Sequence, residues 1–232
     1  MGGGVGNDSS LPGGGSLSGE FIWSLTFTDI FSGWTENSAI FSKASIGVLN
    51  AIKNIEEKIP FSILGFNCDN GSEFLASPLI EYFSPEGEKK RSHQLMSRSR
   101  EYRKNDNCHV EQKNWTHVRE LFAYDRFSDM SLIPLMNEVY DEQRLLNNFF
   151  VPQVKLKYKL RVGAKYKRVY TAPQTPYQRL MEHPSTTEET KERLSIQLES
   201  LNPFELRKRM QMKLKTFYKA LKPKPDETKE VA

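Results

Sequence analysis

The sequence has few of the features that mark secreted, zinc-binding or membrane proteins. Its 232 residues include two cysteines, Cys68 and Cys108, which cannot make a disulfide framework. The four histidines are scattered, and with the cysteines they match no zinc-binding spacing. No apolar run approaches the eighteen or so residues of a membrane span, and the first residues are glycine-rich rather than signal-like. We therefore expect a cytoplasmic protein with reduced, buried thiols and no membrane partner.

Charge is divided unevenly along the chain. Residues 151–232 carry 19 Lys and Arg against 9 Asp and Glu, a balance of +10, whereas residues 1–150 carry 14 against 20, a balance of −6. Together with composition, this division predicts a glycine-rich degenerate leader (1–19), a folded core (20–150) and a basic region of a hairpin plus helices (151–232). The basic part can bind a polyanion; the alternative is a merely solvated tail.

The run from Phe61 to Phe66 predicts a buried strand that stops at the turn signals after Phe66. Asp69 follows at its carboxyl end, where open α/β sheets usually bind ligands. The alternative for Asp69 is an Asx turn that closes the strand. Farther on, a helix capped near Asn105 is expected to carry Glu111 on the same face as apolar residues, including Trp115 and Phe122. The alternative for Glu111 is a partly exposed acid.

Other patterns predict the remaining elements. Residues 21–31 and 34–41 indicate a hairpin, and Val48, Ile52, Ile55 and Ile59 repeat at helical spacing before Pro60. Short elements are expected at 77–83 (helix) and 94–99 (strand), with a helix at 131–147. The last two helices are expected to begin at Ser185, with Glu188 as a capping box, and at Asn202.

Two motifs carry a resemblance to a known family. D-N-G-S-E-F at Asp69 and N-D-N-C-H-V-E-Q-K-N at Glu111 resemble the second and third acidic motifs of the DDE-type integrase catalytic core of bacterial insertion-sequence transposases and retroviral integrases. The match extends over roughly residues 16–180. It implies a ribonuclease-H-like α/β fold, a mixed sheet flanked by helices, followed here by a basic β-hairpin and C-terminal helices. The family's preceding DNA-binding helices are absent, so the chain looks like an N-terminally truncated copy.

The resemblance also implies a chemistry and its partners. Integrase-like cores transfer phosphodiester bonds in DNA with two Mg²⁺ or Mn²⁺ ions, hard cations that take carboxylate ligands. Asp69 and Glu111 would be two catalytic ligands of these ions. For the first carboxylate the spacing favours Asp8, although its surroundings are not an apolar strand; Asp29 is the other acid near the sheet. The partners implied are transposon ends and target DNA, and the chain can form a homo-oligomer.

Basic residues predict where DNA would lie. V-K-L-K-Y-K-L-R-V, residues 154–162, alternates, so that one face of a strand would carry Lys155, Lys157, Lys159 and Arg161. Gly163 and Ala164 could turn this strand into Lys165 to Tyr170. The alternative is a hairpin whose lysines only guard an exposed edge. Further candidates flank Glu111: Arg103, Lys104, Lys113 and Arg119.

Two functions therefore remain open. The first is a metal-dependent transposase or integrase core that performs strand transfer. The second is a catalytically inactive, truncated fragment that only binds DNA. A complete set of three carboxylates distinguishes the first from the second.

Overall fold

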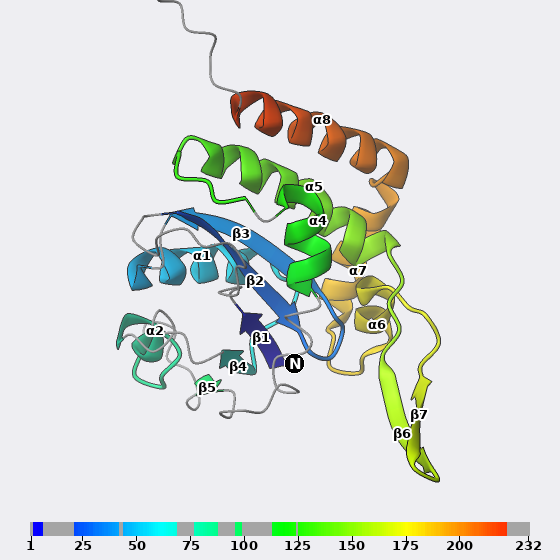
Figure 1. Ribbon diagram of the computed structural model, residues 1–232. Coiled ribbons are helices and arrows are strands. Elements are labelled where there is room, and N and C mark those ends of the chain that lie inside the picture. The colour runs from blue at the N-terminus through cyan, green and yellow to red at the C-terminus, as the bar shows by residue number, and fades with distance from the viewer. Residues whose placement is uncertain are drawn as a thin grey trace, which may run out of the picture.

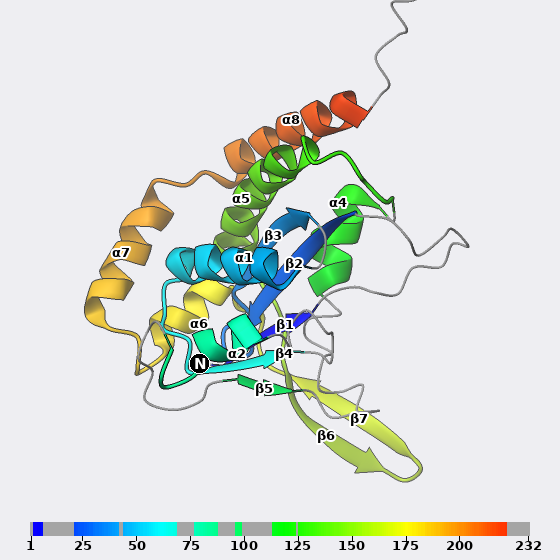
Figure 2. The same cartoon turned by 90° about the vertical axis from the view of Figure 1, so that its left-hand side faces the viewer.

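The computed structural model has a mixed α/β fold (Figures 1 and 2) and describes residues 2–6, 21–41, 44–68, 77–87, 96–98, 113–123 and 125–221. The strands are β1 (Gly2–Gly6), β2 (Ile22–Asp29), β3 (Thr35–Phe41), β4 (Gly65–Cys68), β5 (Met96–Arg98), β6 (Leu156–Val162) and β7 (Lys165–Tyr170). The helices are α1 (Ser45–Lys58), α2 (Ser77–Tyr82), the π-helix η1 (Trp115–Arg119), α4 (Glu120–Phe122), α5 (Leu132–Phe150), α6 (Pro176–Glu182), α7 (Glu188–Glu199) and α8 (Pro203–Leu221).

The first five strands form one mixed sheet in the order β3-β2-β1-β4-β5. β2 runs antiparallel to β1 and β3, whereas β4 is parallel to β1 and β5 is parallel to β4. The register pairs Val5 with Cys68 and Gly3 with Asp29. Consequently β1 and β4 end at the same edge of the sheet, which we call the carboxyl edge, and β2 ends toward the opposite edge.

Two apolar clusters hold the helices to the sheet. In the first, Leu25 and Phe27 of β2 pack with Val48 and Ile52 of α1. In the second, residues of β3, α4, α5 and α8 pack together: Ala39, Phe122, Met136, Val139, Tyr140 and Phe217. Helices therefore lie on both sides of the sheet, with α1 and α2 on one side and α4 and α5 on the other (Figure 1).

Most of the predicted core elements are confirmed. β2 and β3 form the expected hairpin, and α1 ends at Lys58, just before Pro60, with its helical stripe buried. β5 lies at the sheet edge, within the segment where a short strand was expected. β1 lies in the centre of the sheet, although its glycine-rich sequence offers no side-chain pattern that predicts a strand.

Two of the predicted elements differ from the structure. The strand expected at Phe61–Phe66 is β4 and begins only at Gly65; Phe61 packs against the core from an irregular segment, and Leu64 is 61% exposed. In η1, Trp115 is exposed rather than buried with Phe122, because π-helical turns shift the phase of the helix. The inward side chains at the start of this helix are Asn114 and His117.

The C-terminal helices are built into the same fold. Leu180 of α6 and Leu194 of α7 belong to the first cluster, and Leu206 and Phe217 of α8 are fully buried. Glu142 of α5 accepts hydrogen bonds from the side chains of two α8 cations, at 3.0 and 2.8 Å: Arg209 and Lys213. No helix among the described residues is both long and apolar enough to cross a membrane.

Side-chain caps set the starts of these helices. Asn202 caps α8 as expected, because its side-chain oxygen accepts the backbone N–H of Phe204 at 2.9 Å. α7 begins at Glu188 with Thr187, not Ser185, as its cap. α6 was not predicted, although Thr175 and Gln178 form a capping box at its start, a signal that is present in the sequence.

Candidate functional site

The carboxyl edge is the first part of the candidate site. β4 ends at Cys68, next to Val5 of β1, so the chain leaves both strands at neighbouring positions of this edge. Asp69 follows Cys68 directly and Asp8 follows Gly6 by two residues in the sequence. The three expected ligands, Asp8, Asp69 and Glu111, lie outside the described residues, as do Arg103, Lys104 and Cys108.

Packing fixes the end of β4. Phe66 is buried and stacks on Phe83 with ring centroids 4.3 Å apart. Cys68 is fully buried, and its Sγ lies 3.6 Å from the backbone oxygen of Ser97 in β5. The strand that precedes Asp69 is therefore held firmly in the sheet. Among the described residues there is no group of three or more His, Cys, Asp or Glu side chains that could hold a metal ion.

Asp29 is the last residue of β2, directly before the turn that closes the β2–β3 hairpin and away from the carboxyl edge. Its carboxylate Oδ2 accepts the backbone N–H of Ser32 at 2.7 Å and the Ser32 hydroxyl at 2.6 Å. Its Oδ1 is buried and has no hydrogen-bond partner within the described part of the chain. Since Asp29 pairs with Gly3, near the start of β1, it closes a turn and does not face the end of β4.

Two cations hold this turn to the C-terminal half of the chain. Lys155 Nζ donates to the backbone oxygens of Ile30 and Phe31. Arg179 Nη1 donates to the backbone oxygen of Ser32 at 2.9 Å, and its Nη2 donates to that of Gln153. The turn thereby anchors the segment that leads into β6.

The structure gives Lys155 a different position from the one that the alternating pattern predicts. It precedes β6, which begins at Leu156, and its side chain is half-buried against the turn. Burial and then the charge of Arg179 lower the pKa of Lys155 to about 8, while the charge of Asp29 opposes this decrease. A role of Lys155 in DNA binding stays a prediction, whereas the contacts that the structure shows are with backbone oxygens.

Lys113 lies near the same cations, at the start of the helix that continues as η1. Burial, and then the charges of Arg179 and Lys155, lower the pKa of Lys113 to about 8. Burial and the charge of Lys113 lower the pKa of His117 to about 3, so this imidazole is neutral at pH 7. Its Nε2 lies 3.5 Å from Asn147 Nδ2 of α5. Arg119, farther along η1, is half-buried.

β6 and β7 form an antiparallel hairpin that projects from the body of the protein in both views (Figures 1 and 2). We call this hairpin the ribbon. Its two-residue turn has Gly163 at a φ of +61°, which is the requirement of a type II′ turn at its first position. All of its residues are exposed except Val169, which is half-buried. Lys157, Lys159 and Arg161 are therefore accessible to a ligand, and Arg161 Nε also donates to the backbone oxygen of Gly163 at 3.2 Å.

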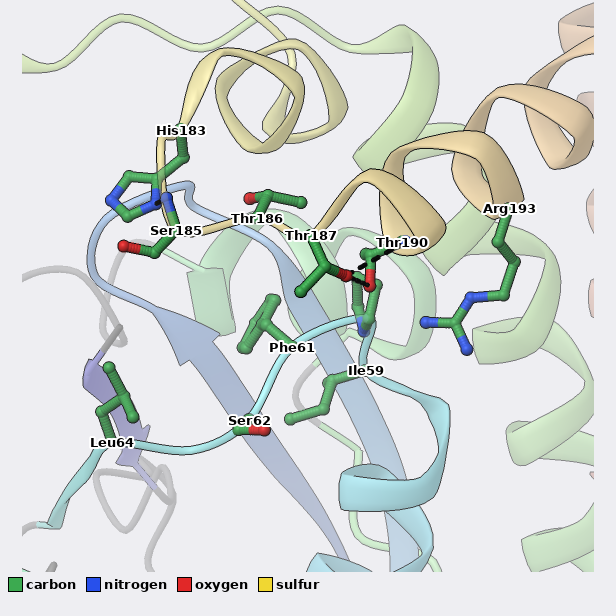
Figure 3. A pocket seen from close by; sticks show the side chains of 11 residues that line it. Ile59, Phe61, Ser62, Leu64, His183, Ser185, Thr186, Thr187, Thr190 and Arg193 are labelled. Carbon is green, nitrogen blue, oxygen red and sulfur yellow. Dashed lines mark hydrogen bonds between the residues drawn. The ribbon is translucent and has the colours of Figure 1, made fainter.

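A cavity of about 470 Å³ lies elsewhere, between the segment after α1 and the start of α7 (Figure 3). Phe61 and Leu64 line one side, and Thr187, Thr190 and Arg193 line the other. The segment leads into the start of β4, so this cavity is not at the carboxyl edge.

The comparisons with known proteins give distant similarities. No protein-family model matches the chain. An uncharacterised protein of Sinorhizobium fredii, y4rM, is 35% identical over 166 residues, which are 72% of this chain and 46% of that protein. The chain thus spans about half the length of this relative. The catalytic core domain of BIV integrase covers 75% of this chain and 91% of its own, with 13% identity and a TM-score of 0.38, too distant to carry a function across.

Proposed function

We propose that this chain is a DDE-type integrase-like catalytic core that performs metal-dependent strand transfer on DNA during transposition. The observation that supports this most is the topology at the carboxyl edge. A strand followed by the D-N-G motif lies parallel to, and ends beside, the central strand that precedes Asp8. The order β3-β2-β1-β4-β5 with an antiparallel β2 is that of the ribonuclease-H-like sheet we infer.

The proposed ligands fit the chemistry of the implied ion. Asp8, Asp69 and Glu111 supply carboxylate oxygens only, the donors that Mg²⁺ and Mn²⁺ prefer. Asp8, Asp69 and Glu111 would hold two such ions, which would supply activation of the attacking oxygen and stabilisation of charge on the phosphoryl and leaving oxygens. In the overall exchange, a DNA 3′-hydroxyl loses its proton and bonds to phosphorus in the target. The target's own 3′ oxygen then leaves and takes up a proton.

The second candidate is a fragment that binds DNA without cutting it. The glycines that follow Asp8 in the sequence, Gly13, Gly14 and Gly15, favour this function, because ordering them costs conformational entropy that few apolar side chains offset. The ribbon would bind DNA equally well in both cases.

Substitution of the acids tests the proposal. Asp69→Asn and Glu111→Gln should each abolish Mg²⁺- or Mn²⁺-dependent nicking and joining of labelled DNA, because each removes a ligand charge. Glu138→Gln, at an exposed acid of α5, should leave activity unchanged and serves as the matched control. Activity that survives either of the first two changes would exclude the assignment. A wild-type chain that binds DNA but never nicks it would favour the second candidate.

A further inference from the structure

The charges of the ribbon lie on both of its faces. Residues 156–170 contain six cations and no acid: Lys157, Lys159, Arg161, Lys165, Lys167 and Arg168. Paired residues of an antiparallel hairpin share a face, and the pairs include Lys159 with Arg168, Leu160 with Lys167 and Val162 with Lys165. The division into one cationic and one apolar face, which alternation along residues 154–162 predicts, is therefore wrong for the hairpin as a whole.

An irregularity in the pairing lies at the end of the ribbon farthest from its turn. The register shifts between Leu156 and Tyr158, since Leu156 pairs with Tyr170 and Tyr158 pairs with Val169. A bulge of this kind moves the residues before it to the other face. From Tyr158 onward, the cationic face carries Lys159, Arg161, Tyr166 and Arg168. The mixed face carries Tyr158, Leu160, Val162, Lys165, Lys167 and Val169.

Neither face is covered within the described structure. The exposed fractions of Tyr158, Leu160 and Val162 are 51%, 52% and 59%, and that of Tyr166 is 64%. An isolated two-stranded hairpin with both faces in water is marginally stable, so this one is suited to gaining contacts on binding. Six cations without an acid make a polyanion the complementary occupant. They also oppose the approach of a second, identical ribbon.

We propose that the ribbon enters the major groove of duplex DNA and contacts phosphates through both faces. This inference rests on the proposed function only in taking DNA as the partner. The major groove is about 12 Å wide and admits a two-stranded β-ribbon. Inside it, both faces of the ribbon meet a wall of phosphates. A ribbon lying flat on the duplex would leave the cations of one face unused.

The ribbon also has a suitable length. The seven residues of β6 span about 23 Å at 3.3 Å per residue, which corresponds to about seven base-pair steps of 3.4 Å.

The test compares charge removal on each face. One variant combines Lys159→Gln, Arg161→Gln and Arg168→Gln, and the other combines Lys165→Gln and Lys167→Gln. Binding to a 30-base-pair duplex is measured by fluorescence anisotropy between 0.05 and 0.2 M salt. At about −0.9 per phosphate contact, the salt slope should fall by about 2.7 in the first variant and about 1.8 in the second. Raising the salt from 0.05 to 0.2 M should therefore reduce the affinity of the first variant by a factor about 40 times smaller than for the wild type. For the second variant this factor should be about 12 times smaller.

Controls separate groove entry from other ways of binding. Neutralising three exposed α8 cations together should leave the slope unchanged: Arg207→Gln, Lys208→Gln and Lys215→Gln. Methylation of guanine N7, which places a methyl group in the major groove, should weaken binding, whereas the minor-groove ligand netropsin should not compete. All variants must keep the wild-type melting temperature, which is expected because these side chains are exposed.

Several results would overturn the inference. A slope that changes in only one variant means a ribbon lying flat, and a slope that changes in neither means no contact with DNA. Self-association that is lost on Leu160→Ser, together with unchanged slopes, would assign the mixed face to a second copy of the chain. Failure of the proposed function is distinct from these outcomes: the slopes and the methylation effect would appear as expected, but the wild-type protein would not nick DNA.

Discussion

Replacing Arg179 by methionine should destabilise the protein and loosen the base of the ribbon. Arg179 is 6% exposed and donates to two backbone oxygens, of Ser32 and of Gln153. It thus joins the turn after β2 to the segment before β6. Methionine keeps much of the apolar stem and removes both donors.

The expected loss of stability follows from these two hydrogen bonds. A hydrogen bond from a charged group contributes about 1.5–3 kcal/mol, so the pair represents about 3–6 kcal/mol. Against this, burial lowers the pKa of Arg179, which means that the charged form is desolvated at this position. Because the variant avoids this cost, we expect Arg179→Met to lower the free energy of unfolding by about 3 kcal/mol.

Urea denaturation measures this change. Arg207→Met, at an exposed position of α8, is the control and should shift the free energy of unfolding by less than about 0.5 kcal/mol. Arg179→Lys keeps the charge but has one nitrogen for two oxygens, so its loss should be intermediate. If Arg179→Met behaved like the Arg207 control, the turn would not depend on these bonds and the reasoning would be refuted.

Two further predictions concern pH and metal. The pKa of His117 falls from 6.5 to about 3 in the folded state, so between these values the unfolded state binds the extra proton. Stability should therefore fall by about 1.4 kcal/mol per pH unit below pH 6.5, relative to His117→Gln. Parallel denaturation curves of the two proteins at pH 4 to 8 would contradict this. Mg²⁺ at ten times its dissociation constant should stabilise the fold by about 1.4 kcal/mol, which calorimetry detects as a rise of about 3–6 °C in melting temperature. An Asp8→Ala variant that keeps the full rise would show that Asp8 is not a ligand.

The sequence predicts those elements whose buried face follows a simple period. α1 and the β2–β3 hairpin are of this kind, because side chains that repeat every three to four or every two residues meet one core. β1 could not be predicted in this way. Its five residues are four glycines and Val5, so its place in the sheet depends on backbone pairing with β2 and β4 rather than on side chains.

The differences at the site have equally local causes. The apolar side chain of Phe61 packs against the core, as its character predicts. Burial does not require backbone pairing, however, and the strand β4 begins four residues after Phe61. The position of Lys155 follows from carbonyl oxygens of a turn more than 120 residues away in the sequence, which no local pattern reveals. The faces that the β7 cations share with β6 follow from the pairing across the Gly163 turn, which no pattern within a single strand reveals.

The ribbon lies away from the carboxyl edge, where the metal site is proposed, so the two parts of the protein would have different roles. Asp29 lies three residues beyond Thr26, the partner of Gly6, and hence about 10 Å from the carboxyl edge along the strand. The ribbon is anchored at the turn after Asp29 and projects away from the sheet (Figures 1 and 2). If the ribbon binds DNA as proposed above, its cations would hold DNA without touching the reacting phosphate. If so, neutralising them should raise the DNA concentration needed for half-maximal nicking while the rate at saturating DNA stays the same, because uniform binding energy is lost and the interactions specific to the transition state remain.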